Sequence, residues 1–291
     1  MSRPMSEYNC TDWLRLRPVL HALKSRRYRL MDEHALSVPS INADLIDKVA
    51  GSLNDQQALV TIAFNDSESI ALQIRLLRQF VPHAIHIVVD NSSNASLASS
   101  IEKVTNNSDS HYVRIHHNPW TGRNPSRSHG FAMNWAYRNV LRSGRPRHFG
   151  FLDHDLYPTE NSDPFDILET TICGGDIRRA NTRWFLWAGY CMFDQSRLGD
   201  HHLNFGLDWF AGLDTGGANW EILYRNIDVA TLYQRPITAE QVWPDVPLQK
   251  AYFERRGTWL HEVGLDGDPD LQKKKQRVLR DRLTKSQRIA A

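Results

Sequence analysis

Residues 148–155 read His-Phe-Gly-Phe-Leu-Asp-His-Asp, and this stretch decides the fold. Its first five residues are mostly apolar, which is typical of a short buried strand. The strand then ends in two carboxylates, Asp153 and Asp155, one residue apart. Two further Asp-x-Asp patterns, at 266–268 and 268–270, lie in a Gly/Pro-containing loop and are interpreted as turn residues. Only Asp153-His154-Asp155 follows a strand.

Outward from this strand, short apolar runs alternate with helical patterns. Strands are predicted at 58–64, 84–89 and 112–115. A helix is predicted between the first two strands, where Ile70, Ile74, Leu77 and Val81 recur at helical spacing, and a second helix at 128–141. This alternation predicts an α/β fold with a mostly parallel sheet, helices on both faces and ligands at the carboxyl ends of its strands.

Polar residues follow the other strands at the same edge. The first strand leads to Asn65 and the second to Asp90. Carboxylates gathered at one sheet edge suit the handling of a diphosphate, because a hard divalent cation takes carboxylate oxygens and bridges phosphate oxygens. The alternative is a solvated turn in which Asp155 caps the following segment.

Four segments in this order, 58–65, 87–93, 128–134 and 151–155, resemble the nucleotide-sugar half of glycosyltransferases with the GT-A fold, and family 2 in particular. The resemblance covers about residues 57–160. It implies a Rossmann-like GT-A sheet, a nucleoside diphosphate sugar as donor, most simply a UDP- or GDP-sugar, and Mn²⁺ or Mg²⁺ as the metal. It also implies that Asp90 contacts the base or ribose, Asp153 the ribose and Asp155 the metal, with Asn65 lining the nucleotide pocket.

The chain departs from family 2 in three motifs. Met133 stands where family 2 members often carry Arg before the Asn of the third motif. The Glu-Asp pair that supplies the base in inverting members is missing, which leaves the stereochemistry open between inverting and retaining. The processive Gln-x-x-Arg-Trp signature also fails, because Ala180 stands in the place of Gln before Arg183-Trp184. We therefore expect a non-processive enzyme.

An inverting transfer needs a carboxylate that takes the proton of the acceptor hydroxyl. Asp214 is the candidate, because the glycines around it would let the backbone approach a ligand. The alternatives are that Asp214 is a turn residue before a helix at 220–225, or that Asp208 is the base. By its late position, His261 resembles the metal-binding histidine of several GT-A enzymes; the alternative is a histidine packed under a loop.

Aromatic rings pack against the C–H faces of sugars, and the second half of the chain is rich in tryptophan. Trp187, Trp209 and Trp220 are therefore predicted to contact the acceptor, with a simple core role as the alternative. Further strands are predicted at 184–193 and 229–233.

Charge is uneven along the chain. The net charge is +2, yet residues 1–30 carry +5, residues 271–291 carry +7 and the remainder carries −10. The two basic ends are candidates for contact with an anionic membrane or an acidic partner, the alternative being solvated helices. The acidic body argues against nucleic acid as a partner.

Four regions are expected: a helical N-terminal extension (1–56), a nucleotide-sugar-binding half (57–160), an acceptor-binding half of the same domain (161–270) and a basic C-terminal tail (271–291). No apolar run is long enough to cross a bilayer, no secretory signal is recognisable, and three widely spaced cysteines form neither a disulfide framework nor a zinc cluster. The expected location is the cytoplasm, at the inner face of the membrane if the basic ends bind lipid.

Together these features predict a metal-dependent glycosyltransferase that is inverting and non-processive and acts on a glycan or lipid-linked acceptor. One alternative is a sugar-nucleotide nucleotidyltransferase, which would favour a Gly-rich, basic first loop in place of Phe64-Asn65-Asp66-Ser67. The other is a non-catalytic sugar-binding protein.

Overall fold

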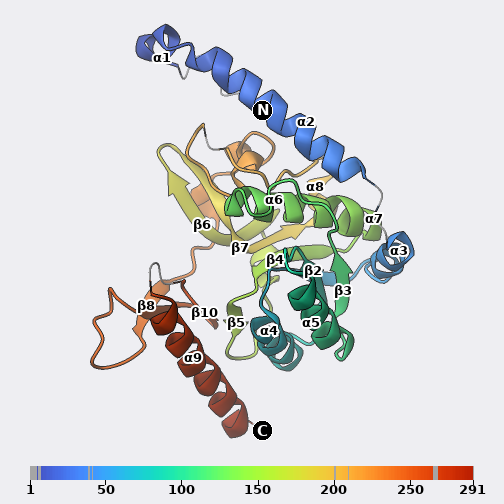
Figure 1. Cartoon of the computed structure of the whole chain (residues 1–291), viewed down its shortest axis with the longest axis vertical. Helices are drawn as coiled ribbons and strands as arrows, with labels where there is room; N and C mark the ends of the chain where they lie inside the picture. Colours follow the sequence, from blue (N-terminus) through green and yellow to red (C-terminus); the bar gives the residue numbers. More distant parts are fainter. Residues whose placement is uncertain are drawn as a thin grey trace.

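The computed structural model describes residues 5, 8–38, 40, 42–199, 201–208, 210–264 and 268–290, and the side chains of that last segment as far as 284. Its centre is a six-stranded sheet in the order β3-β2-β1-β4-β7-β6 (Figure 1). The strands are β1 (Gln57–Ala63), β2 (Ile85–Asp90), β3 (His111–Arg114), β4 (His148–Asp153), β6 (Cys173–Ala180) and β7 (Arg183–Asp194).

The sheet is mostly parallel, as predicted. Strands β3, β2, β1 and β4 pair in parallel, β7 runs against β4, and β6 runs against β7. After β3 the chain returns to the far side of β1 to form β4, so the strand order reverses between β1 and β4. Ligands of open α/β sheets bind at the carboxyl ends of the strands at such a reversal. The Asp153-His154-Asp155 turn lies at this point.

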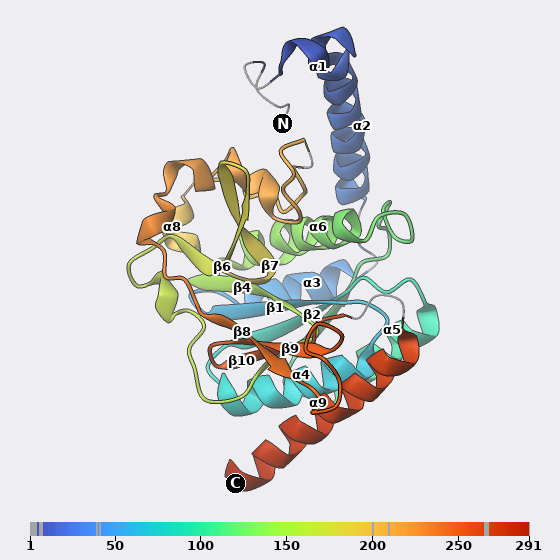
Figure 2. The ribbon, with the colours of Figure 1, turned by 90° about the vertical axis from the view of Figure 1, so that its left-hand side faces the viewer.

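Helices cover both faces of the sheet (Figures 1 and 2). One face packs against α3 (Ala43–Gly51), α6 (Pro125–Ala136), a π-helical turn (Tyr137–Leu141) and α7 (Arg142–Gly144); the other packs against α4 (Ser67–Phe80) and α5 (Ala95–Asn106). The side chains of β1 alternate between these layers, because successive strand residues point to opposite faces. Val60 joins the core that contains Phe131, whereas Leu59 joins the core that contains Leu76.

A second, antiparallel sheet that the sequence analysis did not predict packs near α4. Its order is β5-β10-β9-β8, with β5 (Leu156–Pro158), β10 (Trp259–His261), β9 (Tyr252–Arg256) and β8 (Ile237–Gln241). The basic C-terminal segment forms a helix, α9 (Pro269–Ala290), which buries Leu279 and Leu283 in the same core as Phe253 of β9. This sheet joins the far end of the chain to the turn at Asp155, because His261 pairs with Leu156.

The segment after β7 is less regular than predicted. The short helix α8 (Gln195–Leu198) follows β7, and a 3₁₀ helix at Asp166–Leu168 precedes β6. The predicted strand at 229–233 is wrong: Val229–Thr231 forms a 3₁₀ turn. Asp228 accepts a hydrogen bond from the backbone N–H of Ala230, and this cap outweighs the β propensity of the valine and threonine.

The helix predicted at 220–225 is also wrong. Two 3₁₀ helices, Gly217–Trp220 and Tyr224–Asn226, stand in its place, separated by a turn. The strand predicted at 184–193 is confirmed as β7.

The N-terminal residues form the predicted helices. The first α-helices that the structure describes are α1 (Cys10–Leu14) and α2 (Arg17–Ser37), which project from one end of the molecule (Figures 1 and 2). None of the described helices is long and apolar enough to cross a membrane. Cys10, Cys173 and Cys191 are free thiols.

Gly130 allows the segment that carries Asp214 to lie close to α6. A Cβ at Gly130 would lie 2.6 Å from the carbonyl oxygen of Phe205, which accepts the N–H of Gly216. We expect Gly130→Ala to lower the free energy of unfolding by about 1–3 kcal/mol, because backbone must shift to admit the methyl group. Urea denaturation measures this loss. Gly51→Ala is the matched control, since a Cβ at this helical glycine meets nothing within 4 Å; an equal loss in both variants would contradict the expectation.

Candidate active site

A cavity of about 1160 Å³ opens at the carboxyl ends of β1 and β4. Its walls come from the ends of β1 and β4, the loop before α6, strands β6 and β7, and the glycine-rich loop at 212–215. Its lining includes the side chains of Phe64, Asn91, His129, Asp153, Asp155, Arg178, Arg179, Trp187 and Asp214. Residues predicted from separate parts of the sequence therefore share one cavity.

A buried glutamine holds the turn that carries the two aspartates. Gln73 on α4 is fully buried, and its Nε2 donates to the carbonyl oxygens of Asp153 at 2.7 Å and Leu156 at 2.8 Å. Its Oε1 accepts from Thr61 Oγ1 at 2.8 Å. The backbone on both sides of Asp155 is thus fixed against α4 and β1.

Asp153, Asp155 and His261 form a group whose ligand atoms all lie within 4.8 Å of one another. Nε2 of His261 lies 3.5 Å from Oδ1 of Asp155, which lines the cavity. Two carboxylates and an imidazole are a donor set that suits Mn²⁺ or Mg²⁺, since carboxylate oxygens bind both ions and imidazole suits transition metals. The residues therefore fit a divalent cation of this kind.

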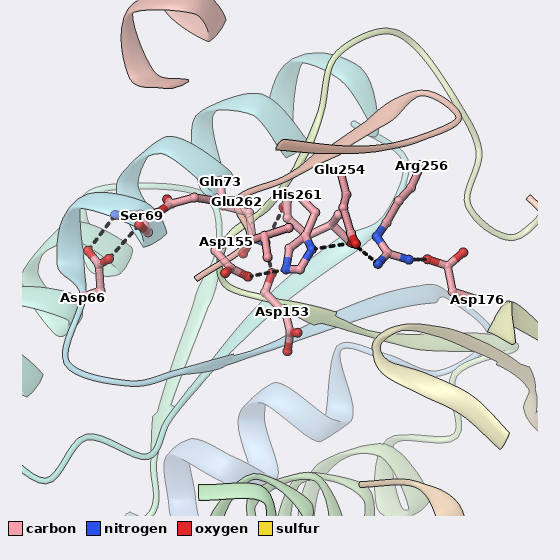
Figure 3. Close-up of polar contacts among 12 residues, drawn as sticks. Asp66, Ser69, Gln73, Asp153, Asp155, Asp176, Glu254, Arg256, His261 and Glu262 are labelled. Atoms are coloured by element: carbon pink, nitrogen blue, oxygen red, sulfur yellow. Dashed lines mark hydrogen bonds and ion pairs between the residues drawn. The ribbon is translucent and has the colours of Figure 1, made fainter. Parts of the chain in front are cut away.

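Behind His261, charged side chains form a continuous row (Figure 3). Nδ1 of His261 lies 3.3 Å from Oε2 of Glu254, and the same carboxylate accepts from Nη2 of Arg256. Nη1 of Arg256 donates to Asp176 on β6. The row Asp155–His261–Glu254–Arg256–Asp176 thus connects the second sheet to the first.

The row orients His261. A carboxylate on Nδ1 keeps a proton on that nitrogen and turns Nε2 toward Asp155, which is the arrangement of a metal-binding histidine backed by a carboxylate. The ring of Trp187 packs edge-on against His261, with centroids 4.8 Å apart, and the Arg256 guanidinium lies 4.2 Å from the centre of the same ring. The histidine has little freedom to turn away.

These neighbours shift the pKa values of the row. Burial lowers the pKa of His261, but the Asp155 and Glu254 carboxylates outweigh it and raise the pKa to about 9. The hydrogen bond from His261 lowers the pKa of Glu254 to about 2, and Arg256 acts in the same direction against the effect of burial. Burial raises the pKa of Asp155, but His261 more than offsets this and lowers it.

Glu262 and the C-terminal helix lie on the other side of the turn. Burial and the nearby Asp155 raise the pKa of Glu262 to about 7. Its backbone N–H donates to the carbonyl oxygen of Asp155 at 2.9 Å, and its side chain accepts from Gln272. Lys275, also buried, donates to the carbonyl oxygen of Val263. Helix α9 thus contributes to the support of His261.

Asn65 and Asp90 lie at the same sheet edge but are not among the described residues that line the cavity. Asn65 bridges to the next loop through Ser92 Oγ and Ser93 Oγ. Asp90 is fully buried; its oxygens accept from Ser92 N at 2.8 Å and from the Tyr112 hydroxyl at 2.7 Å. The contact of Asn65 and Asp90 with a donor stays a prediction. Asn91, the residue after Asp90, does line the cavity.

Asp214 is exposed and lines the same cavity as the two strand-end aspartates. Its Oδ1 accepts from the N–H of Thr215 at 2.8 Å, and the Thr215 hydroxyl donates to the carbonyl oxygen of Ser126 at 3.0 Å. The reserve candidate Asp208 instead pairs with Arg183 at 2.9 Å and lies outside the described lining of this cavity.

The three predicted acceptor tryptophans have different surroundings. Trp187 lines the cavity beside His261. Trp220 lies outside the cavity lining and packs edge-on against Trp184, with ring centroids 6.5 Å apart. Trp209 lies outside the described residues.

Several residues that line the cavity were not predicted as site residues. Arg178 and Arg179 are in β6, which forms an antiparallel hairpin with β7. This hairpin was not predicted. His129 lies within a segment that was compared with family 2, yet no role was given to it; its Nε2 is 3.8 Å from Oδ1 of Asp153. Phe64, at the end of β1, is 40% exposed. The sequence alone does not show which aromatic side chains are exposed in this way.

Neither a protein-family model nor a curated protein matches the chain. Among solved structures, it is similar to the mannosyltransferase PcManGT from Pyrobaculum calidifontis in complex with GDP-Man and Mn²⁺ (14% identity over 67% of this chain and 58% of that chain, TM-score 0.40). It is also similar to S. aureus TarS residues 1–349 in complex with UDP (14%, 52% and 50%, TM-score 0.36).

A third similar structure is the galactosyltransferase LgtC in complex with donor and acceptor sugar analogs (14% identity, 59% of this chain and 66% of that chain, TM-score 0.36). The chain thus spans between half and two thirds of the length of these three proteins. Two of the three are named as sugar transferases, a mannosyltransferase and a galactosyltransferase.

The row gives the metal-free protein a defined pH dependence. Because the pKa of His261 rises from 6.5 to about 9 on folding, its contribution to stability is complete below about pH 6.5 and is lost as the pH rises through about 9. Glu254 acts in the opposite sense: its contribution is present above about pH 4.5 and is lost as the pH falls through about 2.

We therefore expect the difference in unfolding free energy between wild type and His261→Gln, measured by urea denaturation in EDTA, to shrink by on the order of 3 kcal/mol between about pH 6 and about pH 10. The histidine is largely buried, with 13% of its side chain exposed, so solvent screening removes little of this effect. A difference that stays constant or grows with pH would show that the carboxylates do not hold a charged imidazole.

Proposed function

We propose that the protein is a metal-dependent glycosyltransferase that moves one sugar from a nucleoside diphosphate sugar to a hydroxyl group of a glycan or lipid-linked acceptor, with inversion. The observation that carries the proposal is that Asp155 and the exposed Asp214 line the same cavity, with His261 next to Asp155. Such a cavity combines groups for a diphosphate with a carboxylate for a proton.

Donor binding follows from the charges on the cavity wall. Asp153, Asp155 and His261 would hold Mn²⁺ or Mg²⁺, and a bound ion of this kind neutralises charge on the departing diphosphate. Arg178 and Arg179 line the cavity from β6 and would bind phosphate oxygens with their guanidinium groups. The nucleoside would lie toward Phe64 and Asn91, at the ends of β1 and β2, where an exposed ring can stack on a base.

The transfer step requires one proton acceptor from the chain. The acceptor oxygen attacks the anomeric carbon and forms the new C–O bond, while the bond between that carbon and the diphosphate oxygen breaks and its electron pair leaves with the nucleoside diphosphate. Asp214 takes the hydroxyl proton. Trp187, which lines the same cavity, would pack against a sugar ring and so orient it.

Asp155→Asn preserves size and removes the charge at the metal site. We expect the Mn²⁺-dependent affinity for UDP or GDP to fall by about 100-fold, because loss of an outer-shell partner alone costs 10–100-fold in metal affinity. Calorimetric titration with and without Mn²⁺ measures this. Asp270→Asn is the matched control, since Asp270 belongs to another Asp-x-Asp pattern and is exposed in the first turn of α9. Equal affinities in wild type and Asp155→Asn would sink the proposed donor site.

Asp214→Asn separates proton transfer from donor binding. We expect the variant to bind nucleoside diphosphate and Mn²⁺ as wild type does, while transfer to simple alkyl glycosides slows by about 10²–10⁴-fold. Product formation from UDP- and GDP-sugars measures the rate. Asp208→Asn is the comparison: it breaks an ion pair with Arg183 and is expected to retain transfer. Wild-type transfer by Asp214→Asn would assign the proton to another group.

A further inference from the structure

The outer face of α2 carries an apolar stripe that the described residues of the chain leave exposed. Its members are 52–63% exposed and recur at spacings of three, four and seven residues, which places them on one side of the helix. They are Val19, Leu20, Leu23 and Leu30 of α2, together with Leu16, the residue that precedes the helix. Trp13 and Leu14 of α1 are exposed beside the start of this stripe.

The inner face of α2 is anchored, so the stripe cannot turn inward. Nε1 of Trp120 donates to Asp32 at 2.6 Å, and the ring of Tyr28 packs edge-on against the ring of Trp120 at 5.2 Å. The guanidinium of Arg127 lies 3.8 Å from the centre of the Tyr28 ring. Near the start of α2, His21 packs against Phe210 at 4.3 Å.

Basic side chains are exposed on the same two helices. The exposed cations of α1, α2 and the turn between them are Arg15, Arg17, Lys24, Arg26, Arg27 and Arg29. The acidic residues of the described segment 8–38 do not balance them: Asp12 is buried against Arg17, Asp32 is engaged by Trp120, and Glu33 is the one exposed acid there. The surface is therefore both apolar and strongly positive.

We propose that this arm, α1 and α2, docks on the anionic surface of a phospholipid bilayer, with α2 lying in the plane of the head groups. A helix that exposes leucines and arginines side by side can insert its leucines among the acyl chains while its cations meet lipid phosphates. Arginine and lysine stems also cover apolar surface while their charges reach the head groups.

A second copy of the chain fits the α2 stripe less well than an anionic lipid surface does. Leu16, Leu23 and Leu30 recur every seven residues as in a coiled coil, but Arg26 and Arg27 fall between the last two. Pairing two such stripes would bring like charges together at the seam. An anionic surface removes that repulsion and uses the same arginines.

The structure restricts membrane contact to this arm. The sequence placed basic charge at both ends of the chain, yet α1 and the end of α9 lie at opposite ends of the longest axis of the molecule (Figure 1). One flat bilayer cannot meet both. Helix α9 also uses its apolar residues, Leu279 and Leu283, for packing against the second sheet.

Vesicle co-sedimentation tests the proposal without reference to catalysis. The full chain is mixed with vesicles of phosphatidylcholine alone or of phosphatidylcholine with phosphatidylglycerol, at low and high salt. We expect sedimentation only with phosphatidylglycerol, weakened by salt. Leu20→Glu/Leu23→Glu and Arg26→Glu/Arg27→Glu should each weaken it by about tenfold or more.

The matched control is Leu45→Glu/Leu97→Glu, which alters two exposed leucines on α3 and α5 and should sediment as wild type does. Circular dichroism melts establish that each variant is folded. Unchanged sedimentation of both arm variants would overturn the proposal. So would a wild-type chain that ignores the vesicles and forms a dimer in sedimentation-velocity runs that Leu20→Glu/Leu23→Glu dissociates, because a second copy would then cover the stripe.

Discussion

The buried guanidinium of Arg256 is the constraint on which the site depends. With 1% of its side chain exposed, it must find its counter-charges inside the protein, because a buried charge without a partner costs several kcal/mol. Asp176 of β6 and Glu254 of β9 supply them. The two carboxylates come from different sheets, so one cation fixes how the second sheet sits against the first. Glu254 in turn fixes the ring of His261 behind Asp155.

This arrangement explains why the candidate metal group draws on distant parts of the chain. Asp153 and Asp155 follow β4 at the reversal of strand order, where Gln73 holds their backbone. His261 arrives about a hundred residues later through β10, which pairs with β5 immediately after the aspartates. Because β5 begins directly after the Asp153–Asp155 turn, its pairing with β10 places the imidazole of His261 beside that turn. The buried row keeps the imidazole there before any ligand binds, which lowers the cost of ordering the site.

The elements that the sequence predicted well are those with a local signal. The runs at 58–64 and 148–152 are apolar and bounded by polar residues, so the parallel sheet and the carboxylates at its edge were foreseeable. The second sheet was not, because β5 and β10 have three residues each and exist only through their pairing. Arg256 and Glu254 belong to a short strand of mixed polarity, and nothing local marks them as buried partners. The strand predicted at 229–233 is wrong because a local signal was misleading: the cap by Asp228 outweighs the short β-branched run.

Electron–nuclear double resonance of Mn²⁺ bound together with UDP or GDP tests whether His261 is a metal ligand, because it reports which nuclei lie next to the metal. We expect a phosphorus coupling from the diphosphate and a nitrogen coupling that disappears in His261→Gln, since Nε2 of His261 points toward Asp155. A phosphorus coupling with no nitrogen coupling in the wild type, or a nitrogen coupling that survives His261→Gln, would contradict the proposed role of the histidine and of the row behind it.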